Sequence, residues 1–208
     1  AGALENNEDT GTLQYLASTA MEAGFSTRVL DMQALDLQNG RFFDPAGELV
    51  NRCFKLYPWE WMVDESPDGC LAEMEWLEPI WKLVMSNKAI LATLYELFPD
   101  SPYVLPCYLS RPRSGLFCKK PVFSREGHNV SVVDIRDWEE YVRIAETEGD
   151  YNTGAYVYQE YVEPTAYSGR YPVIGSWIIG GEAAGIGIRE NRMEVTDNLS
   201  EFVPHIIG

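Results

Sequence analysis

Histidine, paired cysteine and positive charge are all scarce in this sequence of 208 residues. It has only two histidines and no Cys-x-x-Cys pair, so we do not expect a zinc site. Lysine and arginine together number 16 against 32 aspartates and glutamates, which gives a formal net charge of −16. A general role in nucleic-acid binding is therefore excluded, because phosphate backbones require a cationic face.

Long apolar runs and a signal peptide are missing as well, so we expect neither a membrane span nor a secreted protein. We interpret the four cysteines as unpaired thiols and expect a reducing, cytoplasmic compartment. The sequence starts without methionine, from which we expect a processed product or a fragment. An apolar content of 46% is enough for a packed core, and the length fits one large domain or two small ones.

Helical and strand-like patterns alternate along the chain, which predicts an α+β fold. A helix over 11–23 followed by a strand over 27–30 is typical of the end of a Rossmann-like layer. The other elements that we expect are helices over 73–84 and 88–98, strands over 52–56 and 155–162, a helix or turn over 137–143, and hairpins over 116–133 and 172–189.

A polar loop inside an apolar hairpin is the clearest functional signal. Residues 118–127 carry Lys120 from a predicted strand into a loop that holds Arg125 and a glycine. Backbone N–H groups and cations in such a loop can surround a polyphosphate. A polar pair interrupts the strand 156–162, and the second hairpin ends in Arg189. We therefore predict a nucleotide held between sheets, with Arg189 directed at the reacting end.

Two further residues leave alternative interpretations open. Glu60 lies between two tryptophans, where a carboxylate needs a partner, so it either belongs to the packed core or binds a substrate cation. With Arg125, it is our candidate for substrate binding. Lys88 falls in the first turn of a predicted helix, where the helix dipole disfavours a cation. It is either a solvated surface lysine or a ligand of a phosphate bound at that helix terminus.

The chain resembles the glutathionylspermidine synthase family of ATP-grasp ligases, and within it the short, single-function proteins described as acid–amine ligases. The matching blocks follow in order along nearly the whole chain: FKLYPWEWM (54–62), SNKAIL (86–91), KP (120–121) with SREG (124–127), PVIGSW (172–177), GIGIR (185–189), TDN (196–198) and FVPH (202–205). The resemblance implies an ATP-grasp-like fold, in which two α+β subdomains with antiparallel sheets clamp a nucleotide. It further implies a partial pre-ATP-grasp, Rossmann-like segment over residues 1–60 and an ATP-grasp region over residues 61–208.

The resemblance also implies roles for individual residues. Lys88 and Lys120 are expected to contact the phosphates of ATP, and Gly127 to belong to the loop over them. Arg189 is expected to stabilise the transferring phosphoryl group and the acyl phosphate. The residues expected to line the adenine pocket are Gln159, Glu160, Tyr161 and Val162.

The reaction that the resemblance implies joins a carboxylate to an amine. The carboxylate attacks the γ-phosphorus of ATP to form an acyl phosphate, and the amine then displaces phosphate to leave an amide. The expected substrates are a peptide-like acid, with glutathione as a candidate, and an amine, with a polyamine as a candidate. The family's block of Mg²⁺ ligands has no counterpart here, so we expect those ligands in an N-terminal half supplied in cis or in trans. The alternative is a non-catalytic nucleotide-binding or interaction module that retains the ATP-grasp architecture.

Overall fold

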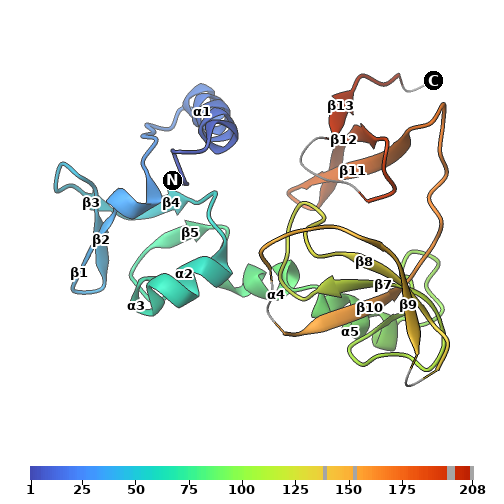
Figure 1. The fold of residues 1–208 in the computed structure, drawn as a ribbon. Helices are drawn as coiled ribbons and strands as arrows, with labels where there is room; N and C mark the ends of the chain where they lie inside the picture. Colours follow the sequence, from blue (N-terminus) through green and yellow to red (C-terminus); the bar gives the residue numbers. More distant parts are fainter. Residues whose placement is uncertain (138–139, 152–153, 196–199, 207–208) are drawn as a thin grey trace. The chain divides into compact units, whose positions relative to one another are not determined.

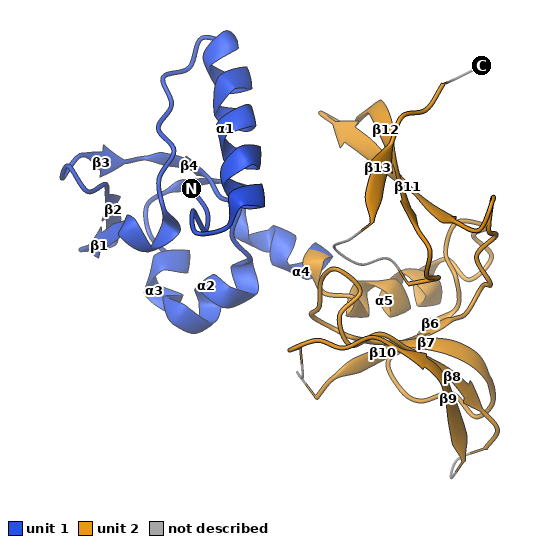
Figure 2. Cartoon of the chain, turned by 45° about the horizontal axis from the view of Figure 1, so that its top comes forward, with its two compact units in different colours: residues 1–85 blue, residues 86–208 orange. Residues whose placement is uncertain are grey.

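The computed structural model describes residues 1–137, 140–151, 154–195 and 200–206. The chain divides into two compact units, Ala1–Met85 and Ser86–Gly208 (Figure 2). Both contain helices and antiparallel strands (Figure 1), which agrees with the predicted α+β class. Across the residues described, no helix combines the length and the hydropathy that crossing a bilayer requires. The boundary between a pre-ATP-grasp segment and an ATP-grasp region, expected at residues 60–61, stays a prediction.

The first unit opens with helix α1 (Asn7–Glu22), which begins earlier than the predicted 11–23. Asn6 caps it, because its side-chain oxygen accepts a hydrogen bond from the Glu8 backbone N–H at 2.9 Å. The strand predicted over 27–30 was wrong, since these residues form neither helix nor strand. A strand needs a hydrogen-bonded neighbour, and here only the following Asp31 makes an isolated parallel bridge, to Gly2.

Short strands and helices complete the first unit. Strands β1, β2 and β3 form an antiparallel sheet, and β4 pairs in parallel with β5. The bounds are β1 (Asp36–Gln38), β2 (Arg41–Phe43), β3 (Leu49–Val50), β4 (Arg52–Phe54), α2 (Trp59–Glu65), α3 (Pro67–Cys70), β5 (Glu75–Leu77) and α4 (Leu83–Ser86), with 3-10 turns η1 (Met32–Ala34) and η2 (Ile80–Lys82). The helix predicted over 73–84 was wrong, because pairing with β4 draws its first part into a strand.

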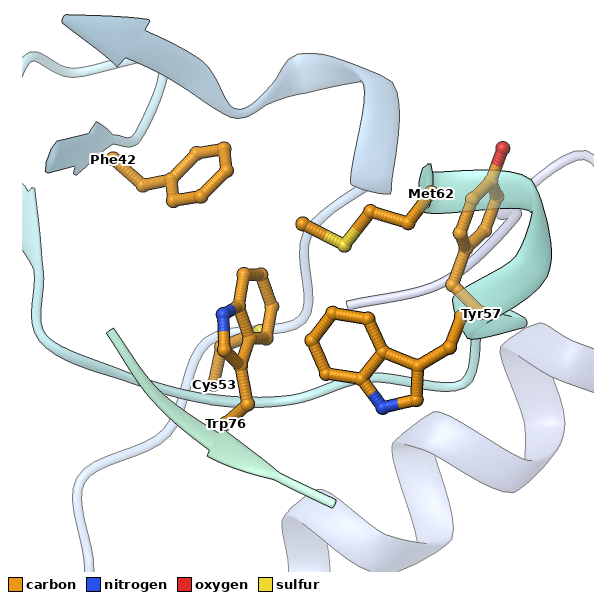
Figure 3. Close-up of a cluster of buried hydrophobic side chains, with 6 residues drawn as sticks. Phe42, Cys53, Tyr57, Met62 and Trp76 are labelled. Carbon is orange, nitrogen blue, oxygen red and sulfur yellow. The ribbon is translucent and has the colours of Figure 1, made fainter. Parts of the chain in front are cut away.

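An aromatic core holds the first unit together (Figure 3). The Trp76 ring meets Phe42 and Trp59 edge-on, at centroid distances of 5.5 and 5.6 Å. Met62 fills the space beside them and is 3% exposed. Lys55 is buried as well, and its ammonium group donates to a backbone carbonyl and lies 4.0 Å from the Trp59 ring centroid. The tryptophans at 59 and 76 are therefore packing residues.

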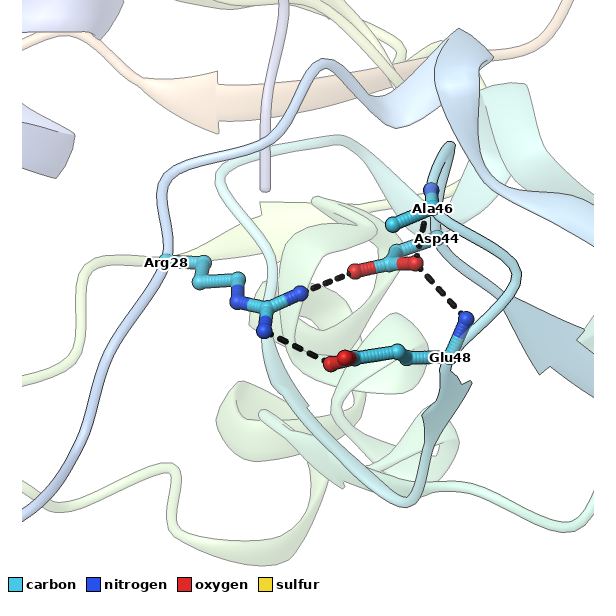
Figure 4. A network of polar contacts seen from close by, with 4 residues as sticks. All are labelled: Arg28, Asp44, Ala46 and Glu48. Atoms are coloured by element: carbon cyan, nitrogen blue, oxygen red, sulfur yellow. Dashed lines mark hydrogen bonds and ion pairs between the residues drawn. The ribbon is translucent and has the colours of Figure 1, made fainter.

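A polar network fixes the extended segment after α1 to the β2–β3 turn (Figure 4). The Arg28 guanidinium forms ion pairs with Asp44 and Glu48. Asp44 also accepts the backbone N–H groups of Ala46 and Glu48, at 2.9 and 2.8 Å. The Glu48 N–H is the main reason that the pKa of Asp44 lies below its ordinary value. Side-chain contacts thus fix a segment that has no β-ladder of its own.

The second unit contains helix α5 (Ala89–Leu97) and a five-stranded antiparallel sheet in the order β6-β10-β7-β8-β9. Its strands are β6 (Cys107–Tyr108), β7 (Gly115–Pro121), β8 (Ser131–Ile135), β9 (Tyr141–Glu146) and β10 (Tyr156–Glu160). The predicted helix near 88–98, the hairpin near 116–133 and the strand near 155–162 are therefore confirmed. The helix or turn predicted over 137–143 starts as a turn, in which the Arg136 and Asp137 N–H groups donate to the Glu140 carbonyl, but residues from Tyr141 onward pair with β8 as an edge strand; residues 138–139 lie outside the described residues.

A three-stranded antiparallel sheet in the order β11-β12-β13 completes the second unit. Its strands are β11 (Tyr171–Ile179), β12 (Glu182–Asn191) and β13 (Glu201–Val203). The predicted hairpin 172–189 is confirmed, and Gly180 and Gly181 take positive φ angles at its turn. Arg189 lies on the central strand of this sheet.

Candidate functional site

Lys120 and Gln159 meet on one face of the five-stranded sheet. In the β7–β10 ladder Lys120 is opposite Val157, and Gln159 is opposite Cys118. Residues two apart on a strand share a face, so all four side chains lie on the same side of the sheet. The Lys120 ammonium group donates to the Gln159 side-chain oxygen at 2.7 Å. A neutral amide therefore orients this lysine without cancelling its charge.

Lys88 connects the start of α5 to the β7–β8 loop, residues 122–130. Its backbone N–H donates to the carbonyl of Val122 at 2.8 Å. Its ammonium group donates to the carbonyl and the hydroxyl of Ser124, at 2.5 and 2.9 Å. The Asn87 side-chain oxygen accepts the Ala89 N–H at 2.9 Å, just before the N-cap residue Lys88. The ammonium group of Lys88 therefore lies against the loop and not in open solvent.

The same loop has two consecutive residues in the left-handed region. Glu126 and Gly127 have φ angles of 56° and 73°, so the chain turns sharply where the sequence predicted a phosphate loop. The hydroxyl of Thr147 contacts the Gly127 carbonyl and accepts the Val130 N–H at 3.0 Å. Arg125 is exposed on this loop. The segment after β9 therefore holds the loop through hydrogen bonds of the Thr147 hydroxyl.

Gly149 lies close against the loop. A Cβ atom added there would lie 2.4 Å from the Cβ of His128 and 2.9 Å from the side-chain oxygen of Asn129. That oxygen accepts the Tyr151 backbone N–H at 2.8 Å. Sequence reasoning did not select Thr147 or Gly149, because their role depends on a contact between segments that are about 20 residues apart. The glycine within a polar stretch was the only available signal.

The predicted adenine residues lie at the end of β10 and just after it. Glu160 donates its backbone N–H to Pro106 at 2.8 Å, and Tyr161 donates its own to Leu116 at 3.0 Å. The Tyr161 hydroxyl donates to Glu194 at 2.6 Å, and this hydrogen bond is the main reason that its pKa is raised. Gln159 is half-buried, whereas Glu160 and Val162 are exposed.

The remaining candidates lie elsewhere in the chain. Arg189 is half-buried on β12, paired with Val173 and Phe202, and its guanidinium lies 5.9 Å from the Phe202 ring centroid. Glu60 is a half-buried residue of α2 in the first unit. The motif residues Thr196, Asp197 and Asn198 lie outside the described residues. The structure thus brings Lys88, Lys120 and Gln159 to the β7–β8 region, while Arg189 belongs to the second sheet of the same unit.

A resident metal ion has no set of ligands in the part of the chain that the structure describes. No group of three or more histidine, cysteine, aspartate or glutamate side chains is placed to hold one there. The four cysteines are free thiols. Burial raises the pKa of the Cys118 thiol beside Lys120, which disfavours the reactive thiolate. The chemistry of the site therefore depends on its cations and backbone groups.

Comparison with known proteins gives consistent matches. A family model described as "Glutathionylspermidine synthase preATP-grasp" matches residues 1–208. A Haemophilus influenzae protein named "Putative acid--amine ligase" is 36% identical over 207 residues, which cover 95% of this chain and 53% of that protein. A trypanothione synthetase of Crithidia fasciculata is 35% identical over 130 residues, 61% of this chain and 19% of its own length. The bifunctional glutathionylspermidine synthetase/amidase of Escherichia coli K12 is 26% identical over 232 residues, 96% of this chain and 36% of its own length.

The chain spans about half the length of the Haemophilus protein and smaller parts of the other two relatives. All three are named as ligases or synthetases, the general class of enzyme that the family resemblance implied. The family model covers the chain from end to end, and the relatives share its name or its chemistry. The resemblance seen in the sequence is thereby confirmed, and the chain belongs to the glutathionylspermidine synthase family.

Proposed function

We propose that this chain is the nucleotide-binding part of an ATP-dependent carbon–nitrogen ligase. The observation that carries the proposal is the placement of two lysines at one loop. The N–H of Lys88 bonds to Val122, two residues after Lys120, and the Lys88 ammonium group bonds to Ser124 in the same loop. A lysine that is fixed to a loop with a sharp glycine turn, and a second lysine on the strand that leads into that loop, suit a polyphosphate.

Local charge supports the proposal although the chain as a whole is acidic. Lys120 makes its described hydrogen bond to the uncharged amide of Gln159, and within the described residues no carboxylate forms an ion pair with it. Its positive charge therefore remains available to a phosphate group. The net charge of −16 arises from the whole chain and does not decide the potential at one half-buried site.

The proposed reaction assigns each residue one task. Lys88 and Lys120 bind the phosphates of ATP, the backbone around Gly127 covers them, and residues 159–162 face the adenine. Arg189 stabilises the charge that develops during formation of the acyl phosphate, and a preorganised guanidinium lowers such a barrier by several kcal/mol, on the order of 3–5. The described residues do not fit a magnesium site, so no step is assigned to a metal held by this chain.

The finer features of the proposal follow the family. We assign an ATP-grasp arrangement in which two subdomains clamp the nucleotide, a pre-ATP-grasp segment over residues 1–60, and a cytoplasmic location. The names of the relatives, which refer to glutathionylspermidine and trypanothione, support a peptide-like acid such as glutathione and an amine such as a polyamine. Glu60 and Arg125 are the proposed substrate residues. A ligase half that carries the Mg²⁺ ligands is the proposed partner, in cis or in trans.

A second candidate function is a nucleotide-binding or interaction module without catalysis. One observation favours it: the described residues hold no set of metal ligands. The ligase part and a nucleotide-binding module both require Lys120 to bind ATP and differ in turnover, whereas an interaction module requires no ATP binding.

Calorimetric titration with ATP, with and without Mg²⁺, tests the proposal. Lys120→Met removes a charge-assisted contact worth about 1.5–3 kcal/mol, which corresponds to a loss of roughly tenfold to a hundredfold in affinity. Lys119→Met is the matched control, because its side chain comes from the same strand and the opposite face.

Each result of this titration has a distinct meaning. Binding that Mg²⁺ strengthens and that Lys120→Met weakens by about tenfold or more supports the ligase site. Binding that needs Lys120 but ignores Mg²⁺ supports an incomplete ligase whose Mg²⁺ ligands lie in the other half, and turnover when that half is added separates it from the module without catalysis. Absence of binding, or equal losses in both lysine variants, contradicts a nucleotide site on this face.

A further inference from the structure

Lys119, which precedes Lys120 on β7, borders a cavity on the other face of the five-stranded sheet. Consecutive residues of a strand point to opposite faces, so Lys119 shares its side with Tyr158, its neighbour across the β7–β10 ladder. The cavity has a volume of about 80 Å³. Its lining residues are Arg111, Lys119, Val133, Ile135, Tyr141 and Tyr158.

Two cations and two tyrosines form the polar wall of this cavity. The Arg111 guanidinium lies 4.9 Å from the ring centroid of Tyr141, and the Lys119 ammonium group lies 3.9 Å from that of Tyr156. Among the residues that the structure describes, neither cation forms an ion pair with a carboxylate. Two cations without acidic partners are notable in a chain with twice as many acidic as basic residues.

One donor in this wall is buried and unsatisfied. Arg111 donates through a terminal nitrogen to the Asp137 carbonyl at 3.0 Å, but its Nε has no hydrogen-bond partner among the described residues. Buried donors are almost always paired, so an unpaired one indicates a water molecule or a bound group that is not part of the chain. Burial raises the pKa of Tyr158, so its hydroxyl keeps its proton and can donate as well.

The floor and the size of the cavity limit the ligand. Val133 and Ile135, which are 1% and 2% exposed, form an apolar floor that favours a ligand with a carbon body over a fully hydrated ion. Sites for drug-sized molecules measure roughly 300–1,000 Å³, so about 80 Å³ admits a small group and excludes a nucleotide. The planar fork of a guanidinium matches the two oxygens of a carboxylate.

We propose that this cavity binds a small organic carboxylate, with Arg111 and Lys119 as its cationic contacts and Val133 and Ile135 against its carbon body. The site is separate from the proposed nucleotide site, because the two lysines that mark them point to opposite faces of β7. The inference does not depend on the proposed ligase activity.

Fluorine NMR of trifluoroacetate with the 208-residue chain tests this proposal. We expect saturable line broadening that acetate reverses. Arg111→Met and Lys119→Met should each weaken binding by about tenfold or more, because each removes a charged hydrogen-bond donor. Lys120→Met is the matched control and should leave the titration unchanged. Tyr158→Phe removes one hydroxyl, keeps the ring, and should weaken binding severalfold.

Competitors separate a carboxylate site from other anion binding. Inorganic phosphate should displace the probe no better than chloride at equal ionic strength. ATP bound on the face that carries Lys120 should not displace the probe. The proposal is overturned if broadening does not saturate, if it persists in the double variant Arg111→Met/Lys119→Met, or if phosphate competes as well as acetate. Circular dichroism checks the fold of each variant. If Arg111→Met does not fold, Lys119→Met and Tyr158→Phe decide the question.

Discussion

The contact between Gly149 and His128 leads to a prediction that depends on structure alone. Gly149→Ala introduces a Cβ 2.4 Å from the His128 Cβ and 2.8 Å from its Cγ. Real Cβ atoms do not approach so closely, and the nearest atom belongs to the base of the side chain. Rotation of the imidazole cannot relieve that contact, so the backbone of one segment must move. The segment beside it is the β7–β8 loop.

Two opposing terms set the expected magnitude. Replacing glycine by alanine at a compatible backbone angle stabilises by about 0.4–1 kcal/mol, because the unfolded chain loses freedom. Overpacking costs about 1–3 kcal/mol. We therefore expect a net loss of roughly 1–2 kcal/mol, which lowers Tm by about 2–8 °C for a protein of this size.

Differential scanning calorimetry of Gly149→Ala beside Gly185→Ala is the appropriate measurement. Gly185 is the matched control, because a Cβ added there meets no atom within 4 Å. Combining Gly149→Ala with His128→Ala should recover only part of the loss, since the contact at Cγ disappears and the contact at Cβ remains. A Gly149→Ala variant with a Tm equal to that of the wild type or higher would refute the reasoning.

The remaining predictions concern the two cores. Val157 is 0% exposed and packs against Ala92 and Cys107, so Val157→Ala should lower the free energy of unfolding in urea by roughly 2–3 kcal/mol. The control Val142→Ala, on the exposed edge strand, should lower it by less than about 1 kcal/mol. Equal losses of free energy in the two variants would contradict this packing. Burial, with a hydrogen bond to Glu65, raises the pKa of Tyr57 from 10.0 to about 12. The contribution of this shift to stability is fully present below about pH 10 and declines up to about pH 12. The urea midpoint should therefore fall over this interval in the wild type and fall less in Tyr57→Phe. Parallel curves of urea midpoint against pH for the two proteins would contradict the prediction.

Elements whose partners are adjacent in sequence could be predicted from the sequence. The β7–β8 and β11–β12 hairpins have alternating apolar residues on both sides of a turn, so their pattern contains the whole pairing. β5 could not be predicted in this way, because its partner β4 is distant in sequence, whereas β9 was missed although its partner β8 directly precedes it. The helical spacing over 73–84 is genuine, but residues 75–77 pair with β4, more than 20 positions earlier. Tertiary pairing there outweighs local preference.

The candidate site shows the same division. Lys88, Lys120 and the glycine turn are parts of local motifs, so the sequence and the family resemblance could identify them. The Lys120–Gln159 hydrogen bond joins residues 39 positions apart, and only the β7–β10 register reveals it. The support that Thr147 and Gly149 give to the loop has no local signature beyond a glycine in a polar stretch. Long-range contacts between irregular segments are the part that the sequence could not provide.

The adjacent lysines also make β7 sensitive to insertions and deletions. Side chains on a strand alternate between the two faces. If one residue of β7 before Lys119 is deleted and the lysines keep their positions, every side chain of β7 that precedes the deletion moves to the opposite face. If Cys118 is deleted, for example, Phe117 moves from its buried position to the half-buried position of Cys118 on the opposite face. A deletion scan through residues 115–118 should therefore disrupt both faces of the sheet together, whereas point substitutions at the two lysines affect one face each.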